Sequence, residues 1–119
     1  MIKILIKYFL LFSLFGFGFS QVDYNSEIQT IFNNNCGNCH LGNSSGGLNL
    51  SSYTDVMSGG NSGAVIIPYD HAASVIYDRI TREESAAGDM PPTGSLSQSQ
   101  IDLIAQWIDE GALEEPLDN

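Results

Sequence analysis

Both cysteines of this chain and one of its two histidines lie in a single pentapeptide, Cys36-Gly37-Asn38-Cys39-His40. The spacing C-x-x-C-H is the signature of covalent haem attachment through two thioether bonds. One helical turn places both sulfurs along one edge of the macrocycle, and the histidine that follows can swing beneath the iron. Imidazole is a common ligand of haem iron. The motif therefore predicts one covalent haem c attached to Cys36 and Cys39, with His40 as an iron ligand.

Two cysteines at this spacing also occur in disulfides, in redox-active dithiols and in zinc sites. Zinc prefers four ligands, and the chain offers only these two cysteines and, besides His40, one other histidine, His71. A thioredoxin-like dithiol needs a βαβ setting, and the sequence has no convincing alternating strand pattern. The alternative function is a periplasmic thiol-disulfide oxidoreductase that uses Cys36 and Cys39.

The first twenty residues differ in composition from the rest. Two lysines precede an uncharged run, 8–19, and small residues occupy the −3 and −1 positions of a cleavage site after Ser20. This pattern is typical of a secretory signal peptide. The run is shorter than the ~20 apolar residues of a membrane span, so an uncleaved anchor is the less favoured alternative. We expect a signal peptide at 1–20, a single domain at 21–119, and a periplasmic or otherwise exported protein without a membrane span.

Cleavage would leave a strongly acidic domain. All fourteen acidic side chains lie after Ser20, where Arg79 and Arg82 are the only basic ones, so the formal charge becomes −12. Such a surface disfavours nucleic acid and anionic membranes and favours basic proteins. We expect no nucleic-acid partner, a monomer, and redox partner proteins with basic docking surfaces.

Apolar residues at helical spacing predict short helices over 22–35, 53–57 and 71–82, and a last helix between Ser97 and Gly111. Ser97 forms a capping box with the glutamine three residues later, and Gly111 suits the C-terminal cap. The other N-cap candidates are Asp23 or Asn25, Ser51 or Ser52, and Asp70. Together these elements predict an all-α fold of four to five short helices around one haem.

Two of these helices carry apolar faces that indicate how they pack. In the third helix, Ala72, Ile76 and Ile80 share one stripe. In the last helix, six apolar residues span about 200° of the circumference, which predicts burial against more than one neighbour. They are Ile101, Leu103, Ile104, Ala105, Trp107 and Ile108.

Three side chains are candidates for the second iron ligand: Met57, His71 and Met90. Met57 ends an apolar helix face, where a methionine usually fills the core. His71 lies in the first turn of a predicted helix, where a solvated histidine is ordinary. Met90 lies in a loop and precedes two prolines, which stiffen the backbone and can hold a weak thioether ligand in place. We therefore favour Met90, and His71 before Met57 as the alternative.

The sequence resembles the class I c-type cytochromes and, more closely, the short planctomycete-type cytochrome c domains. The resemblance is carried by residues 36–40, 47–53, 59–68, 90–92 and 96–112. It implies that His40 is the proximal and Met90 the distal iron ligand, and that the first and last helices of a small all-α fold cross. Many class I members have a proline soon after the haem motif, whose carbonyl accepts from the proximal histidine. No proline follows here, so we expect that acceptor to be a backbone carbonyl of loop 42–49 or one near Pro68.

The expected function is one-electron transfer, because an iron with two protein ligands has no free position for a substrate. The chain is therefore predicted not to be an enzyme. If Met90 does not bind the iron, the distal site would be open, and a haem sensor or a peroxidase becomes the alternative.

Overall fold

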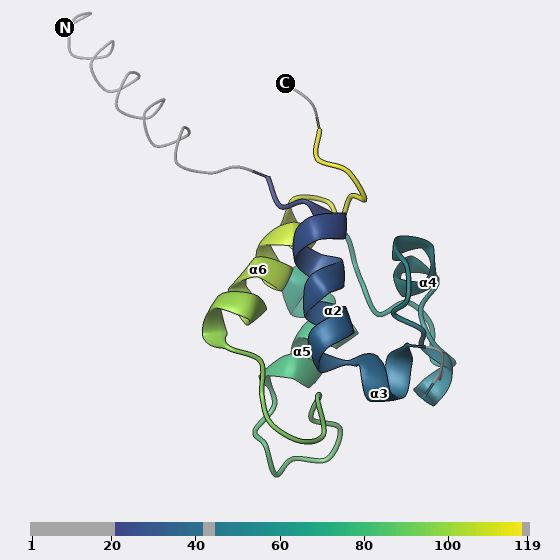
Figure 1. Ribbon diagram of the computed structural model, residues 1–119, viewed down its shortest axis with the longest axis vertical. Coiled ribbons are helices and arrows are strands. Elements are labelled where there is room, and N and C mark those ends of the chain that lie inside the picture. Colours follow the sequence, from purple (N-terminus) through teal and green to yellow (C-terminus); the bar gives the residue numbers. More distant parts are fainter. Residues whose placement is uncertain (1–20, 42–44, 118–119) are drawn as a thin grey trace, which may run out of the picture.

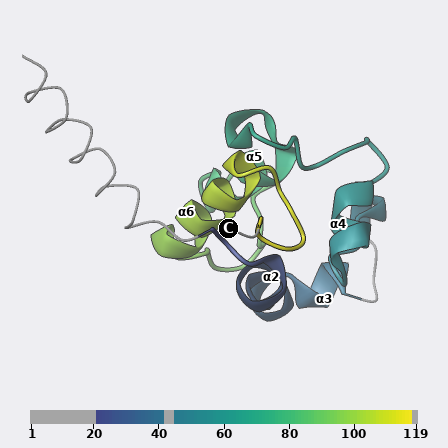
Figure 2. The ribbon, with the colours of Figure 1, turned by 90° about the horizontal axis from the view of Figure 1, so that it is seen from above.

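The computed structural model describes residues 21–41 and 45–117. Within these ranges all regular structure is helical, apart from one antiparallel bridge between Gly60 and Gly63, so the predicted all-α fold is confirmed. Figures 1 and 2 show helices α2, α5 and α6 grouped on one side, with α3 and α4 beside them. The predicted signal peptide, 1–20, lies outside the described residues. None of the described helices is long and apolar enough to cross a membrane.

The first helix leads directly into the pentapeptide. It begins with a π-helical turn, η1 (Tyr24–Ile28), and continues as α2 (Gln29–Asn35). Asp23 caps it by accepting from the backbone N of Ser26 at 2.9 Å, as one of the two predicted caps. The helix ends at Cys36, and α3 (Gly37–His40) follows at once.

Two glycine turns are tied together beside the pentapeptide. The first holds the short 3-10 helix η2 (Ser45–Gly47), and the second follows α4 (Tyr53–Ser58), which Ser52 caps. The backbone N of Asn61 donates to the carbonyl of Gly46 at 2.8 Å. Gly47 has φ +77°, and a Cβ there would lie 2.9 Å from the backbone N of Asn61. The close approach of the two turns therefore requires glycine at position 47.

The helix predicted over 71–82 is interrupted, and this prediction was wrong in part. A 3-10 helix, η3 (His71–Ala73), is capped by Asp70 as expected, but Ser74 is extended and α5 covers only Val75–Thr81. The buried Ser74 hydroxyl donates to the Asp70 carbonyl at 3.0 Å and accepts from the backbone N of Ile67 at 2.8 Å. These contacts hold the chain in a corner, so Ala72 is exposed and does not share the buried stripe of Ile76 and Ile80.

The last helix, α6 (Gln98–Asp109), has the predicted capping box between Ser97 and Gln100. Its buried residues are Ile101, Ile104, Trp107 and Ile108. Leu103 and Ala105 are only half-buried, so the buried face is narrower than predicted. Gly111 has φ +111° just beyond the helix, which suits the predicted C-terminal cap.

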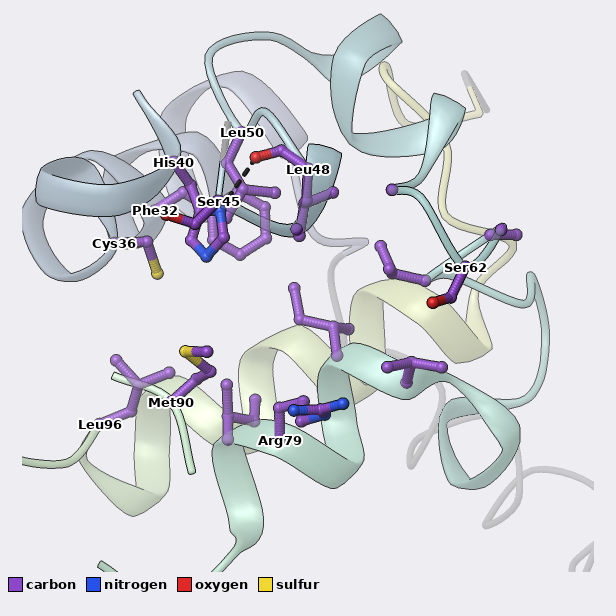
Figure 3. A pocket seen from close by; sticks show the side chains of 18 residues that line it. Phe32, Cys36, His40, Ser45, Leu48, Leu50, Ser62, Arg79, Met90 and Leu96 are labelled. Carbon is purple, nitrogen blue, oxygen red and sulfur yellow. Dashed lines mark hydrogen bonds between the residues drawn. The ribbon is translucent and has the colours of Figure 1, made fainter. Parts of the chain in front are cut away.

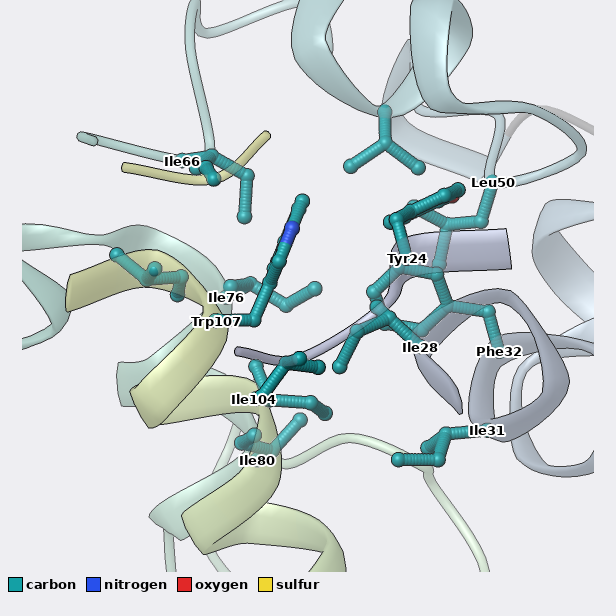
Figure 4. Close-up of a cluster of buried hydrophobic side chains, with 14 of the residues drawn as sticks. Tyr24, Ile28, Ile31, Phe32, Leu50, Ile66, Ile76, Ile80, Ile104 and Trp107 are labelled. Atoms are coloured by element: carbon teal, nitrogen blue, oxygen red, sulfur yellow. The ribbon is translucent and has the colours of Figure 1, made fainter. Parts of the chain in front are cut away.

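The start of the first helix packs against the end of α6 and forms the centre of the core (Figure 4). The ring centroids of Tyr24 and Trp107 lie 5.2 Å apart. The Tyr24 hydroxyl donates to Gln29 Oε1 at 2.6 Å, and Trp107 Nε1 donates to the Leu113 carbonyl at 2.8 Å. Both aromatic side chains are therefore buried with their polar atoms satisfied, as stable cores require.

Candidate functional site

Two adjoining cavities open beside the pentapeptide and share Cys36, His40 and Met90 (Figure 3). The first has a volume of about 230 Å³ and is lined mainly by apolar side chains of α2, α5 and the glycine turns. The second, of about 560 Å³, is lined by both cysteines and by residues 90–95. The predicted site residues are thus brought together around one space.

His40 is buried at the edge of this space, with 8 % of its surface exposed. Its Nδ1 lies 2.9 Å from the carbonyl oxygen of Leu48. A carbonyl can only accept, so Nδ1 carries the proton and Nε2 is left with a free lone pair. Leu48 belongs to the loop 42–49, so the expectation of a backbone acceptor in that loop is confirmed.

A second hydrogen bond holds the same loop against α3. The backbone N of Leu50 donates to the carbonyl of His40 at 2.7 Å. Leu50 is buried and Leu48 is partly buried. The loop is therefore docked by its own side chains, which fixes the carbonyl that orients the imidazole.

Cys36 lies at the junction of α2 and α3, and Cys39 lies within α3. Neither forms a disulfide, and both are partly buried. Burial, with a smaller contribution from Cys39, raises the pKa of Cys36 to about 11. The thiol of Cys36 is therefore protonated at neutral pH, whereas redox-active dithiols have a lowered pKa.

Met90 reaches the space from the loop that follows α5. Its backbone N donates to the carbonyl of Arg79 at 3.0 Å. Two arginines hold the loop before Met90. Arg79, on α5, has its Nη1 3.4 Å from the Gly88 carbonyl oxygen, and Arg82, which directly follows α5, has its Nη1 2.5 Å from the Ala87 carbonyl oxygen. Figure 3 shows Met90 across the cavity from His40.

The other two ligand candidates lie elsewhere. Met57 packs against the hydrophobic core, as predicted. His71 is bound to α6, with its Nδ1 2.8 Å from Oδ2 of Asp109. Neither residue lines either cavity, so Met90 is the one candidate of the three that does.

Residues 36–94 match the family model of the planctomycete cytochrome C domain. The predicted resemblance is confirmed: residues 36–94 form a planctomycete cytochrome C domain. The match begins at the first cysteine and includes Met90. Searches of curated proteins and of solved structures found no match. The chain is therefore a c-type cytochrome, and its cofactor is haem.

The residues around the cavity of this cytochrome fit a haem. The cavity separates an imidazole nitrogen from a thioether sulfur, the donor pair of many cytochromes c, and has a thiol at its rim. Phe32, Leu50, Ile76 and Ile80 give it an apolar lining that suits the flat macrocycle. The unshared lone pair on Nε2 of His40 is the donor that an iron would require.

Sequence reasoning missed two residues at the site of this cytochrome. The acceptor for His40 was expected only within the eight-residue loop 42–49 or near Pro68, so the Leu48 carbonyl was not singled out. Arg79 lines the apolar cavity and was assigned no role. The available signal was that only two arginines remain after Ser20. Arg82 pairs with Asp78 at 2.6 Å, which leaves the role of Arg79 to be explained.

Proposed function

We propose that this cytochrome is an exported one-electron carrier. One haem c is attached through Cys36 and Cys39, and its iron is held by His40 and Met90. The observation that carries the proposal is that these residues, and neither Met57 nor His71, border the same cavity. With His40 and Met90 both holding the iron, a bound haem would supply reversible exchange of one electron between Fe(III) and Fe(II).

The side chains would support this chemistry by holding the iron ligands still. The Leu48 carbonyl fixes the tautomer and tilt of His40 and increases the basicity of Nε2. The backbone of Met90 is anchored to Arg79, and two prolines follow. Rigid ligands and an apolar lining keep the site similar in both oxidation states, which favours fast electron exchange.

Export is part of the proposal. Residues 1–20 have the pattern of a signal peptide, and residues 21–119 would form the mature monohaem domain, a monomer that is not an enzyme. Haem is attached to cytochromes of this type outside the cytoplasm, so an exported location agrees with the pentapeptide. The acidic mature chain would meet redox partners with basic docking surfaces.

Neither alternative function has an observation that favours it. A thiol-disulfide oxidoreductase needs a thiolate near neutral pH, and burial raises the pKa of Cys36 to about 11. A haem sensor or a peroxidase needs an open distal position, and Met90 borders the cavity across from His40.

The covalent haem is tested first, on protein matured in a host that attaches haem c. The denatured protein should keep its colour on a gel, give the pyridine haemochrome spectrum of haem c, and gain the mass of one haem. A colourless protein from a competent host would refute the proposal.

The distal ligand is tested by Met90→Ala, with Met57→Ala as the matched control. The oxidised parent should show the weak far-red band of sulfur bound to Fe(III). Met90→Ala should lose this band, lower the redox potential and bind cyanide or CO rapidly, because a sixth position opens and the thioether favours Fe(II). Met57→Ala should keep the band. Loss of the band in Met57→Ala alone would show that the ligand is Met57 and not Met90. A parent without the band would favour His71 as the ligand.

A further inference from the structure

Arg79 is the one Lys, Arg, Asp or Glu among the described residues that line the apolar cavity. It is half-buried on α5, on the same side as Ile76 and Ile80, which line the cavity with it. Its guanidinium has five N–H donors, and its one hydrogen bond in the described part of the chain is long, 3.4 Å to the Gly88 carbonyl. The guanidinium is partly open to water and acts on the Asp78 carboxylate, and its spare donors at an apolar cavity would suit a further anion there.

The chemistry of haem says where such an anion would be. The two propionates lie on the edge of the macrocycle away from the vinyl groups. Thioether bonds to Cys36 and Cys39 would fix the vinyl side near α3, so the carboxylates would point to the other end. Figure 3 shows Cys36 and Met90 toward one end of the cavity and Ser62 toward the other, with the Arg79 guanidinium between Met90 and Ser62.

We propose that Arg79 binds a haem propionate, with the Ser62 hydroxyl as a second donor to the same carboxylate edge. This inference rests on the proposed function, since it requires the haem to be tethered at the cysteines. A carboxylate at the rim of an apolar cavity is costly without a partner, and a guanidinium can offer it two parallel hydrogen bonds. A guanidinium beside the propionate also offsets the negative charge that stabilises Fe(III), so Arg79 raises the redox potential.

Arg82 supplies a matched control for this proposal. It carries the same charge, follows the end of α5, and also anchors the loop before Met90, through the Ala87 carbonyl. It does not line either cavity. Arg79→Gln and Arg82→Gln therefore both remove one charge and one loop contact. Arg82→Gln also removes the exposed ion pair with Asp78, and only Arg79→Gln removes the cation at the cavity.

The experiment measures the redox potential, the far-red band and the propionate bending modes in the resonance Raman spectrum of the holoprotein. Arg79→Gln should lower the potential several times more than Arg82→Gln, shift the propionate modes, and keep the far-red band. Arg79→Lys should keep most of the potential and still shift the modes, because a lysine retains the charge and loses the planar fork. If Arg79→Gln does not retain haem, the propionate modes of Arg79→Lys decide whether Arg79 contacts the propionate.

Two results would overturn the inference. Unchanged propionate modes in Arg79→Gln, or in Arg79→Lys where only that variant holds haem, would show that Arg79 does not touch the carboxylate. A fall in potential together with loss of the far-red band would mean that Arg79 acts only by holding the Met90 loop. Both differ from failure of the proposed function, in which the parent itself lacks covalent haem or the far-red band.

Discussion

At the scale of single residues, the orientation of His40 depends on a carbonyl that a glycine positions. Gly46 and Gly47 both have positive φ, at +65° and +77°, but their surroundings differ. A Cβ at Gly46 meets nothing within 4 Å, whereas one at Gly47 overlaps Asn61. The two positions therefore separate backbone strain from displacement of the Leu48 carbonyl.

We expect Gly46→Ala to lower the free energy of unfolding by about 1 to 2 kcal/mol, the cost of a left-handed alanine. Gly47→Ala should cost more, because the overlap with Asn61 is added, and it should also shift the absorption bands of the oxidised haem as His40 is displaced. Denaturant unfolding and visible spectra of both variants measure this. Equal costs and unchanged spectra would show that the contact with Asn61 has no bearing on His40.

The raised pKa of Cys36 gives a pH dependence for the haem-free chain. The ordinary thiol value is 9.0 and the folded value is about 11, so the folded state holds this proton to higher pH than the unfolded state. The corresponding stability is fully present below pH 9.0 and is lost as pH rises toward 11. Alkylation of Cys36 at pH 8 should therefore be slower in the folded chain than in urea, and should rise steeply toward pH 11. Mass spectrometry measures the rates, and circular dichroism verifies folding.

A folded Cys36 that reacts at pH 8 as fast as the unfolded one would contradict this expectation and revive the dithiol alternative.

The residues proposed to hold the haem could be selected from the sequence because their evidence is local. Cys36, Cys39 and His40 are adjacent, and Met90 stands out by the prolines after it. The role of the Leu48 carbonyl and the place of Arg79 could not be predicted in the same way. Both depend on how loops fold over α3 and α5, and neither residue type is unusual at its position.

At the scale of elements, the last helix was predicted well because its cap and its apolar period lie within one segment. The helix over 71–82 was predicted too long, because the Ser74 hydroxyl binds backbone groups of the preceding turn, at Ile67 and Asp70. A periodic pattern does not register such a contact. A serine inside an apolar stripe can therefore turn the chain through its hydroxyl instead of continuing the helix.

Trp107→Ala should destabilise the protein by about 3–5 kcal/mol, the usual cost of truncating a large buried aromatic side chain. Trp107 is 1 % exposed and joins α6 to the first helix through Tyr24. Leu117→Ala is the control, because Leu117 is 64 % exposed and should cost less than about 0.5 kcal/mol. Thermal or denaturant unfolding measures both. Equal stability of Trp107→Ala and the parent would show that α6 is not docked through this residue.

At the scale of the whole molecule, the charge of −12 after Ser20 should govern encounters with redox partners. Electron transfer to a basic partner should slow as ionic strength rises, because salt screens the attraction that steers the two proteins together. Stopped-flow kinetics over a range of salt concentrations measures this. The control is an acidic partner of similar potential, for which the rate should rise with salt. A rate to the basic partner that is flat or rises would mean that the charge serves solubility alone.

The burial of Trp107 against Tyr24 also allows unfolding to be followed by intrinsic tryptophan fluorescence. Trp107 is the single tryptophan of the chain, and it lies in the same core as Phe32, which lines the cavity. Haem absorbs where indole emits, so a haem in that cavity would quench the fluorescence by energy transfer. The emission of the holoprotein should be nearly dark and should appear on unfolding, when the indole moves away from the macrocycle. The unfolding of each variant that keeps this tryptophan can thus be measured by the fluorescence of one residue, without a label.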